Sequence, residues 1–239
     1  MNLFAPPRHF DPDEPELIDR PDLDRALLHE ELRLLEDLNR RLSGHKLVLE
    51  SVERLLGSAT PKSLSILDLG TGSADIPRAI VAWARQKKIA ITITAVDGNA
   101  EILKFAKKSS RDWPEINFAQ HDLRSLPYAK NSFDLVLCSL ALHHFNSADA
   151  VAILRRISEI ARTGYAVNDL RRNWLSITFT ELLVRTAIRS KIFRHDAPKS
   201  CRAAFSVPEL RALGESAGLE NFQVTRHHWI FRMILQGKK

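Results

Sequence analysis

The segment at residues 65–77, SILDLGTGSADIP, constrains the fold of this chain more than any other. A short apolar run ends in the carboxylate Asp68 and leads directly into a turn that contains Gly70 and Gly72. This order is typical of a buried strand, a tight turn and a helix that begins near Ile76. Glycines suit the turn because they place no Cβ between the backbone and a ligand. The segment therefore predicts the first strand–turn–helix unit of an α/β fold with a ligand seated at the turn.

Strand and helix patterns alternate after this segment. Apolar, β-branched runs predict further strands at residues 90–96, 116–119, 133–139 and 165–168. Helical spacing of apolar residues predicts intervening helices, including 149–162, a long helix or helix pair over 173–193, and 208–217. Alternation of this kind predicts a doubly wound, Rossmann-like sheet of seven strands, mostly parallel and covered on both faces.

Both ends of the chain add to this sheet. Strands at 222–226 and 229–235 are expected to form an antiparallel C-terminal hairpin that turns through His227 and His228, and we assign these two histidines a structural role. Residues 1–22 contain five prolines among many acids and read as an irregular arm, and two helices with a break at Ser43-Gly44 follow up to residue 56. We expect an N-terminal arm and helical cap over 1–60 and a main domain over 61–239. A helical lid insertion is expected at about 171–206.

Composition bounds the class of protein. The 239 residues are 44% hydrophobic and 27% charged, as in ordinary soluble domains. No run approaches the roughly 18 apolar residues of a membrane span, and the N-terminus lacks the basic start and apolar core of a signal peptide. Only Cys138 and Cys201 are present, which makes a disulfide framework implausible and predicts a cytoplasmic protein.

The net charge of +6 is unevenly distributed. Residues 150–239 carry 16 basic and 7 acidic side chains, a net of +9. Such a region attracts nucleic acid, an anionic membrane surface or an acidic substrate. A solvated, arginine-rich surface is the interpretation that we favour, because the basic residues are interspersed.

Carboxylates stand at three successive strand ends. Asp97 lies 25 residues beyond Gly72 and is placed to accept the hydroxyls of a ribose, while Asp122 is placed to accept from an adenine amino group, with Leu123 against the ring. A lone aspartate is commonly only a helix cap or turn residue, but three in register favour a nucleoside site. Asp68 would repel a pyrophosphate but not a ligand with an ammonium and a sulfonium. The pattern therefore favours S-adenosylmethionine over NAD.

These segments resemble the class I S-adenosylmethionine-dependent methyltransferases. ILDLGTGSADIP matches the first motif of that family, AVDGNAEILKFA its ribose motif, and HDLRSLPYAKNSFDLVLCSLALHHF its adenine and post-adenine motifs. FSVPELRALGESAGLENFQVTRHHW matches the usual last helix and hairpin. Ala74 stands where many members have a third glycine, a small departure. The resemblance implies a cofactor site that includes Asp68, Gly70, Thr71, Gly72, Asp97, Gly98, Asp122, Leu123 and Ser139.

The N-terminal helices and the NDLRR segment resemble a narrower, UbiE-like subgroup of small-molecule methyltransferases. Membership implies a small aromatic, quinone-like or polyketide-derived acceptor. Methyl transfer is an in-line displacement, so the enzyme must align the nucleophile and, for a hydroxyl acceptor, remove its proton. His143 and His144 follow the fourth strand and Asp169 ends the fifth, which predicts a His–Asp base. We favour His143 as the base, and His144 is the alternative. A histidine that only packs or caps the following helix is the alternative role for His143.

Further residues on the same rim are candidate acceptor contacts: His144, Asn168, Arg171 and His195. Arg171 and its neighbour Arg172 would equally suit a solvent-facing or salt-bridged role, and a lone loop histidine such as His195 commonly has no ligand. No spacing of His, Cys, Asp and Glu predicts a metal site. Segment 173–194 is apolar and basic, which favours a lid over the acceptor, although core packing or contact with a membrane surface gives the same pattern.

The sequence thus predicts methyl transfer to a small apolar or aromatic acceptor, with O-methylation favoured and C-methylation open. A nucleic-acid methyltransferase is the alternative enzyme, although no added nucleic-acid-binding module and no Asn-Pro-Pro-type motif is visible. A non-catalytic cofactor-binding protein is the alternative of another class. The oligomeric state is not predicted.

Overall fold

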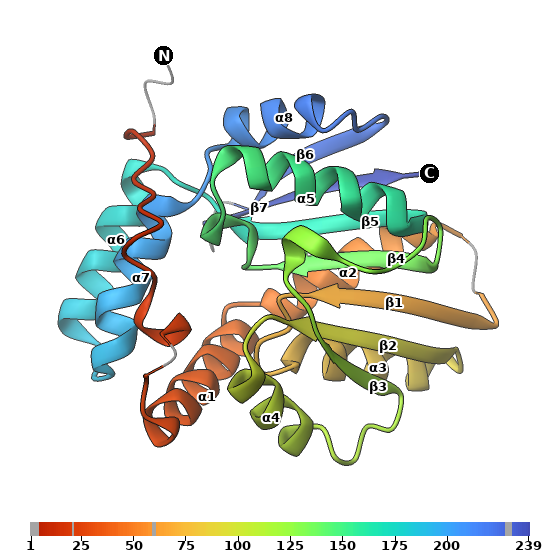
Figure 1. Ribbon diagram of the computed structural model, residues 1–239, viewed down its shortest axis with the longest axis horizontal. Helices are drawn as coiled ribbons and strands as arrows, with labels where there is room; N and C mark the ends of the chain where they lie inside the picture. Colours follow the sequence, from red (N-terminus) through yellow and green to blue (C-terminus); the bar gives the residue numbers. More distant parts are fainter. Residues whose placement is uncertain (1–4, 21, 59–60, 228–230) are drawn as a thin grey trace.

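The computed structural model describes residues 5–20, 22–58, 61–227 and 231–239. Its seven strands form one sheet in the order β3-β2-β1-β4-β5-β7-β6 (Figure 1). The strands are β1 (Ser63–Leu69), β2 (Ala90–Asp97), β3 (Ile116–Gln120), β4 (Phe133–Ser139), β5 (Ala161–Leu170), β6 (Phe222–His227) and β7 (Arg232–Lys238). β1 to β5 pair in parallel, and β7 runs antiparallel to both β5 and β6. The predicted doubly wound sheet with an antiparallel C-terminal hairpin is confirmed.

Eight helices connect and cover these strands in the described residues. They are α1 (Arg25–Arg41), α2 (Gly44–Leu56), α3 (Asp75–Lys87), α4 (Ala100–Ser109), α5 (Ser147–Ile160), α6 (Trp174–Thr186), α7 (Lys191–Ala203) and α8 (Val207–Ser216). There are also three short 3-10 turns in the described residues. η1 (Leu17–Asp19) lies in the arm, and η2 (Leu123–Ser125) and η3 (Leu142–His144) follow the ends of β3 and β4. Side chains cap the N-termini of α1, α4 and α5 by accepting hydrogen bonds from free backbone amides of the first turn. The capping residues are Asp24, Asn99 and Asn146.

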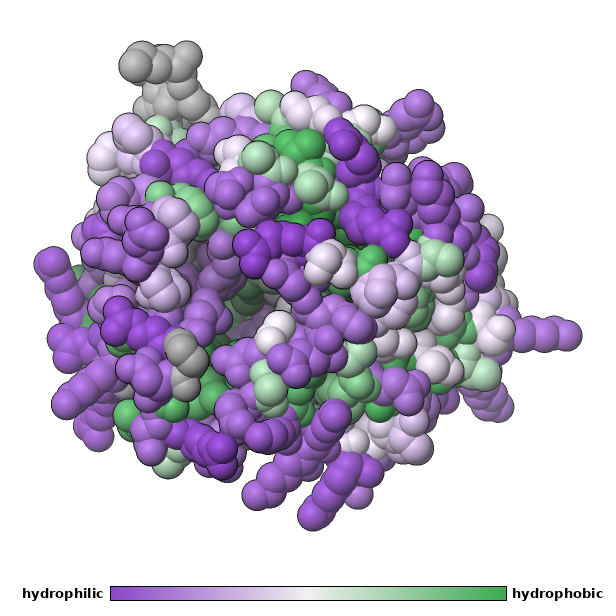
Figure 2. All heavy atoms as spheres, viewed as in Figure 1, coloured by the Kyte–Doolittle hydropathy of each residue, from purple (hydrophilic) through white to green (hydrophobic). Residues whose placement is uncertain are grey.

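The core consists of two apolar layers, one on each face of the sheet. α2 and α3 pack on one face against residues such as Ile66 and Leu137, and α5 and α8 pack on the other against Leu67 and Val136. Because both faces are covered, the central strands are nearly continuous apolar runs rather than alternating ones. The outer surface seen in Figure 2 is mostly hydrophilic, with apolar side chains in separate small areas.

Several element boundaries differ from the sequence prediction, most clearly in three elements. The helix pair expected over 173–193 is α6 and α7, and α7 extends to Ala203. β5 begins at Ala161 rather than 165, because the polar stretch before Tyr165 continues the sheet and Gly164 pairs with Lys238 of β7. The second hairpin strand is Arg232–Lys238 rather than 229–235. His227 is the last residue of β6, and His228 lies outside the described residues.

A helical cap lies beyond the carboxyl ends of the parallel strands. It consists of α1, the arm before α1, α6 and α7, which gather at the left of Figure 1. η1 of the arm contacts α7, and α7 also contacts η3 at the end of β4. The chain thus places its N-terminal arm and its helical insertion at the sheet edge that holds the predicted site residues.

Candidate active site

The glycine turn after β1 is tied to the end of β2. The Thr71 amide donates to the Val96 carbonyl (2.9 Å), and the Gly72 amide donates to Oδ2 of Asp97 (3.0 Å). Asp97 also accepts from the Asn99 amide (3.0 Å), with Gly98 in the turn between them. Burial raises the pKa of Asp97 despite these hydrogen bonds, and the nearby Asp19 carboxylate adds to the increase. The turn and the predicted ribose acid therefore form one hydrogen-bonded unit.

The backbone of this turn is left-handed at three positions. Gly70 has φ +68° and Gly72 has φ +54°, values that suit glycine. Ala74, where many related motifs have a third glycine, also has φ +59° and is fully buried. A Cβ on Gly70 would lie 2.6 Å from the Ala141 Cβ, whereas a Cβ on Gly72 would meet nothing within 4 Å. The turn is thus packed on one side and open on the other.

Asp68 lies in β1 directly before this turn. Its side chain is buried, and this burial raises its pKa to about 7, with the Asp75 and Asp97 carboxylates adding to the increase. A cation beside Asp68 would favour its ionised form. The ammonium group of an amino-acid ligand is a cation of this kind, as the sequence argument requires.

Asp122 is more exposed than a buried adenine contact would be. It caps η2 by accepting from the Arg124 amide (2.8 Å), and its carboxylate pairs with the Arg124 guanidinium (2.6 Å). Leu123 is buried in the core on the α5 side of the sheet, and Ser139 ends β4. Arg124 is the partner that sequence reasoning did not assign to Asp122.

His143 and Asp169 lie together at the ends of β4 and β5. Oδ1 of Asp169 is 2.7 Å from Nδ1 of His143, and Oδ2 accepts from the His143 amide (2.9 Å). The Asp169 side chain is 1% and the His143 side chain 4% exposed. Although burial opposes ionisation, the interaction with His143 lowers the pKa of Asp169. An ionised Asp169 only accepts hydrogen bonds, so Nδ1 of His143 carries the proton of this contact.

Two acids of the N-terminal arm face these histidines, which the sequence reasoning did not foresee. Oε1 of Glu16 lies 3.9 Å from Nε2 of His143, and Oδ2 of Asp19 lies 3.1 Å from Nδ1 of His144. The ring centroids of the two histidines are 4.2 Å apart. The sheet end therefore has carboxylates on both sides of the His143 imidazole.

The arm is held over the site by α7. Asp196 accepts from the Leu17 and Ile18 amides (2.8 and 3.0 Å), and the Ser200 hydroxyl donates to Glu16 (2.6 Å). Arg8 donates to the Phe145 carbonyl (2.8 Å), next to η3. These contacts join positions more than 130 residues apart, so no local pattern in the sequence indicates them.

We expect the His144–Asp19 ion pair to make stability pH-dependent. Burial opposes the charged form of His144, but its hydrogen bond to Asp19 and the charges of Glu16, Asp19 and Asp169 raise its pKa to about 9. The stabilisation is thus complete below the ordinary pKa of 6.5 and disappears as the pH rises through about 9. Urea unfolding of the wild type and His144→Gln should differ by about 1–2 kcal/mol more at pH 6 than at pH 10. A constant difference across this range would contradict the assigned pair.

Three other predicted acceptor contacts lie in different environments. Asn168 is buried near the end of β5. Neither Nδ2 nor Oδ1 of its side-chain amide has a hydrogen-bond partner among the described residues. Arg171 is partly buried, and burial together with Arg226 lowers its pKa. His195 lies inside α7 rather than in a loop, and its Nδ1 is 2.7 Å from Asp196.

Arg172, the alternative rim residue, is a structural arginine. Its guanidinium is buried, binds both carboxylate oxygens of Glu209 (2.5 and 2.7 Å) and donates to the Pro6 carbonyl (3.1 Å). It therefore connects the end of β5 to α8 and to the arm. The salt-bridged role considered for Arg172 holds.

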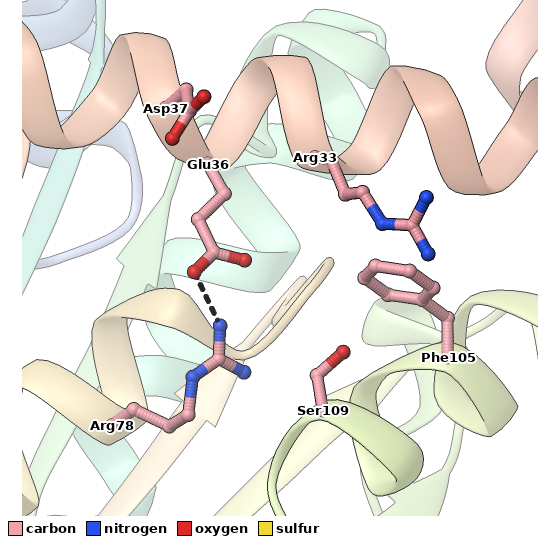
Figure 3. Close-up of a pocket in the computed structure, with 6 residues that line it drawn as sticks. All are labelled: Arg33, Glu36, Asp37, Arg78, Phe105 and Ser109. Carbon is pink, nitrogen blue, oxygen red and sulfur yellow. Dashed lines mark ion pairs between the residues drawn. The ribbon is translucent and has the colours of Figure 1, made fainter.

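The first helices brace the glycine turn from behind. Asn39 and His45 both contact Oδ2 of Asp75, the first residue of α3 (2.6 and 2.7 Å), and Arg78 donates to the Ser73 carbonyl (2.7 Å). Arg78 also pairs with Glu36 of α1 (2.8 Å), as Figure 3 shows. The lining residues of the pocket in that figure, of about 430 Å³, come from α1, α3 and α4.

The described residues bring one group of potential metal ligands together. Atoms of Glu16, His143 and His144 lie within 4.8 Å of one another. The ion pairs with Asp169 and Asp19 already account for the placement of both histidines. The expectation of a metal-free site stays a prediction.

The residues at this sheet edge fit S-adenosylmethionine. The open side of Gly72, the buried Asp68 and the unpaired amide of Asn168 offer space, an anion and hydrogen-bonding groups. Asp97 presents a carboxylate beside the turn for a ribose. A ligand with both a cationic amino-acid end and a ribose meets complementary groups here.

Comparison with known proteins agrees with this assignment. A family model described as a methyltransferase domain matches residues 66–164. The ubiquinone/menaquinone biosynthesis C-methyltransferase UbiE of Rickettsia akari is 39% identical over 72 residues. This match covers 29% of this chain and 29% of the relative, so the chain spans less than a third of the length of that relative.

Solved structures match over a much longer part of the chain. The plantazolicin methyltransferase BpumL in complex with S-adenosylhomocysteine has a TM-score of 0.68 at 17% identity, covering 93% of this chain and 92% of that one. Human N-acetylserotonin methyltransferase in complex with S-adenosylmethionine has a TM-score of 0.65 at 15% identity, covering 90% of this chain and 56% of that one. With the sheet order, these likenesses show the fold of the class I S-adenosylmethionine-dependent methyltransferases, and residues 66–164 match a methyltransferase domain.

Proposed function

We propose that this protein transfers a methyl group from S-adenosylmethionine to a small apolar or aromatic acceptor, with a phenol or quinol hydroxyl as the preferred nucleophile. The observation that carries the proposal is the buried His143–Asp169 pair beside the glycine turn. Gly70, Gly72 and Asp97 would hold the cofactor, which supplies a methyl group activated on a sulfonium.

The proposed reaction assigns one role to each member of the pair. Asp169 fixes the imidazole tautomer through Nδ1, so Nε2 of His143 accepts the proton of the acceptor hydroxyl. The acceptor oxygen then forms its bond to the methyl carbon as the carbon–sulfur bond breaks, and S-adenosylhomocysteine leaves. Asn168, with its unpaired amide, is the proposed contact to an acceptor oxygen.

Glu16 stands where the acceptor hydroxyl would approach Nε2 of His143. Acceptor entry in the proposed reaction therefore displaces the Glu16 carboxylate from the imidazole. The hydrogen bond from the Ser200 hydroxyl holds the Glu16 carboxylate beside the His143 imidazole.

Methylation of a ring carbon is the second candidate. It is favoured by the printed name of the Rickettsia relative, a C-methyltransferase of ubiquinone and menaquinone biosynthesis. A quinol ring with a hydroxyl next to the attacked carbon would use the same base, because loss of the hydroxyl proton makes that carbon nucleophilic.

The test combines binding and turnover. Calorimetry should show binding of S-adenosylhomocysteine but not of NAD, and methyl-labelled S-adenosylmethionine should pass label to phenols or quinols. Mass spectrometry of the product distinguishes an O-methyl from a C-methyl group. Cofactor binding without label transfer to any acceptor would favour the non-catalytic alternative, and label in RNA alone would favour a nucleic-acid substrate.

We also place this activity in the cytoplasm, which suits the buried free thiols of Cys138 and Cys201. None of the helices in the described ranges is both long and apolar enough to cross a bilayer.

A further inference from the structure

The outer face of α6 is apolar although it is exposed. Trp174 (59% exposed), Leu175 (66%), Phe179 (48%) and Leu182 (60%) all belong to this one helix. At about 100° per residue they fall within roughly 140° of its circumference. We call these four side chains the α6 apolar face. Large apolar side chains that cluster on one helix face are usually buried. The exposure of all four side chains therefore indicates a binding surface.

The opposite face of α6 fixes the helix to the protein. Ile177 and Val184 are buried beneath it, and Ser176 forms the capping box with Asn173. Glu181 pairs with Arg202 of α7. On the apolar face itself, only Phe179 has a ring contact, 5.4 Å from the Phe231 ring among the described residues. The helix is thus anchored along its inner side while its apolar face remains outward.

The segment that carries this face is rich in positive charge. Residues 171–203 contain eight Lys and Arg against two acidic residues, a net of +6 that equals the charge of the whole chain. The other residues carry 27 basic and 27 acidic side chains and are therefore neutral. Arg185, Arg189, Lys191 and Arg194 are exposed, and none forms an ion pair with another described residue. The excess charge of the protein is concentrated on the helix pair that carries the α6 apolar face.

We propose that the α6 apolar face docks on the surface of an anionic lipid bilayer. Large apolar and aromatic side chains enter the headgroup region while the cations of the same segment meet anionic headgroups, which is the pattern of interfacial membrane helices. Two copies of this chain would bring two net charges of +6 together, which disfavours pairing of this face with itself. Nucleic acid would satisfy the cations but not four exposed apolar side chains. Docking does not depend on the proposed reaction.

Sedimentation with lipid vesicles tests this surface in the full-length protein. The wild type should bind vesicles of phosphatidylcholine mixed with phosphatidylglycerol, bind pure phosphatidylcholine vesicles weakly, and lose binding at high salt. Leu175→Asp with Leu182→Asp should lower the partition coefficient about tenfold or more. Leu27→Asp with Leu42→Asp is the matched control, because these leucines are also exposed (49% and 45%) but lie at α1.

Charge variants separate specific docking from general attraction. Arg185→Gln, Arg189→Gln and Lys191→Gln together should lower the partition coefficient about a hundredfold. Lys87→Gln, Lys107→Gln and Lys108→Gln remove the same charge from α3 and α4 and should have a clearly smaller effect. Equal thermal unfolding midpoints of the variants and the wild type would show that folding is intact.

Several results would overturn the proposal. These are absence of binding to anionic vesicles, equal losses in the α6 and α1 leucine variants, or equal losses in both charge triples. RNA binding without vesicle binding would assign the basic surface to nucleic acid instead. A dimer that dissociates in Leu175→Asp with Leu182→Asp, again without vesicle binding, would assign the face to a second copy.

Discussion

His143→Gln is expected to lower kcat by about 10²–10⁴-fold while leaving the affinity for S-adenosylhomocysteine nearly unchanged. The glutamine side chain still fills part of the buried site, but it cannot accept the acceptor proton. Asp169→Asn should cause a comparable loss, because an asparagine that donates to Nδ1 would force the proton onto Nε2. Label transfer from the methyl-labelled cofactor measures the rate, and calorimetry measures the affinity.

A second histidine variant distinguishes a base from a packing residue, because only loss of the base should lower kcat. His29→Gln on α1, where the His29 ring packs against the Phe105 ring at a tilt with 4.9 Å between ring centroids, is the matched histidine control. Full turnover in His143→Gln would remove His143 from the proposed mechanism and leave it the structural role of packing at the strand end.

Gly70→Ala is expected to destabilise the fold by about 2–4 kcal/mol, far more than Gly72→Ala. Its new Cβ combines a left-handed φ of +68° with a 2.6 Å approach to the Ala141 Cβ, which has no flexible end to move away. Gly72→Ala meets open space, so only the backbone cost of about 1–2 kcal/mol remains. Ala74 already tolerates a similar φ in the same turn.

The two glycines should also differ in their effect on the cofactor. The Cβ of Gly72→Ala enters the open side of the turn, so calorimetry should show weaker binding of S-adenosylhomocysteine although the fold remains intact. Urea unfolding measures the stability of both variants. Wild-type affinity in Gly72→Ala would mean that the cofactor does not lie against this turn, and a wild-type unfolding midpoint in Gly70→Ala would contradict the close packing on Ala141.

The sequence pattern predicted the sheet and the meeting of His143 with Asp169. Both depend on short apolar runs in the sequence whose ends mark the carboxyl ends of the parallel strands. Such runs can be read from the sequence without knowledge of the tertiary contacts. The lengths of β5 and β7 were predicted less well, because polar residues within them are paired by a neighbouring strand rather than by their own pattern. The role of Asp122 as a cofactor contact stays a prediction, since Arg124 engages its carboxylate.

The arm could not be predicted from its sequence. Its prolines and acids resemble a solvated tail, and its order comes from Asp196 and Ser200, which lie about 180 residues away along the chain. The same is true of Arg172, whose partner Glu209 is 37 residues distant. Long-range pairs of this kind depend on the completed fold and leave no periodic signal.

The position of Glu16 has a kinetic consequence. A molecule that reaches Nε2 of His143 must first separate the Glu16 carboxylate from the imidazole and from the Ser200 hydroxyl. If His143 is the base, as proposed, entry and release there are in series with the chemical step, and the slower of the two sets the turnover rate. Substrates of very different intrinsic reactivity would then share one kcat whenever the arm is the slower partner.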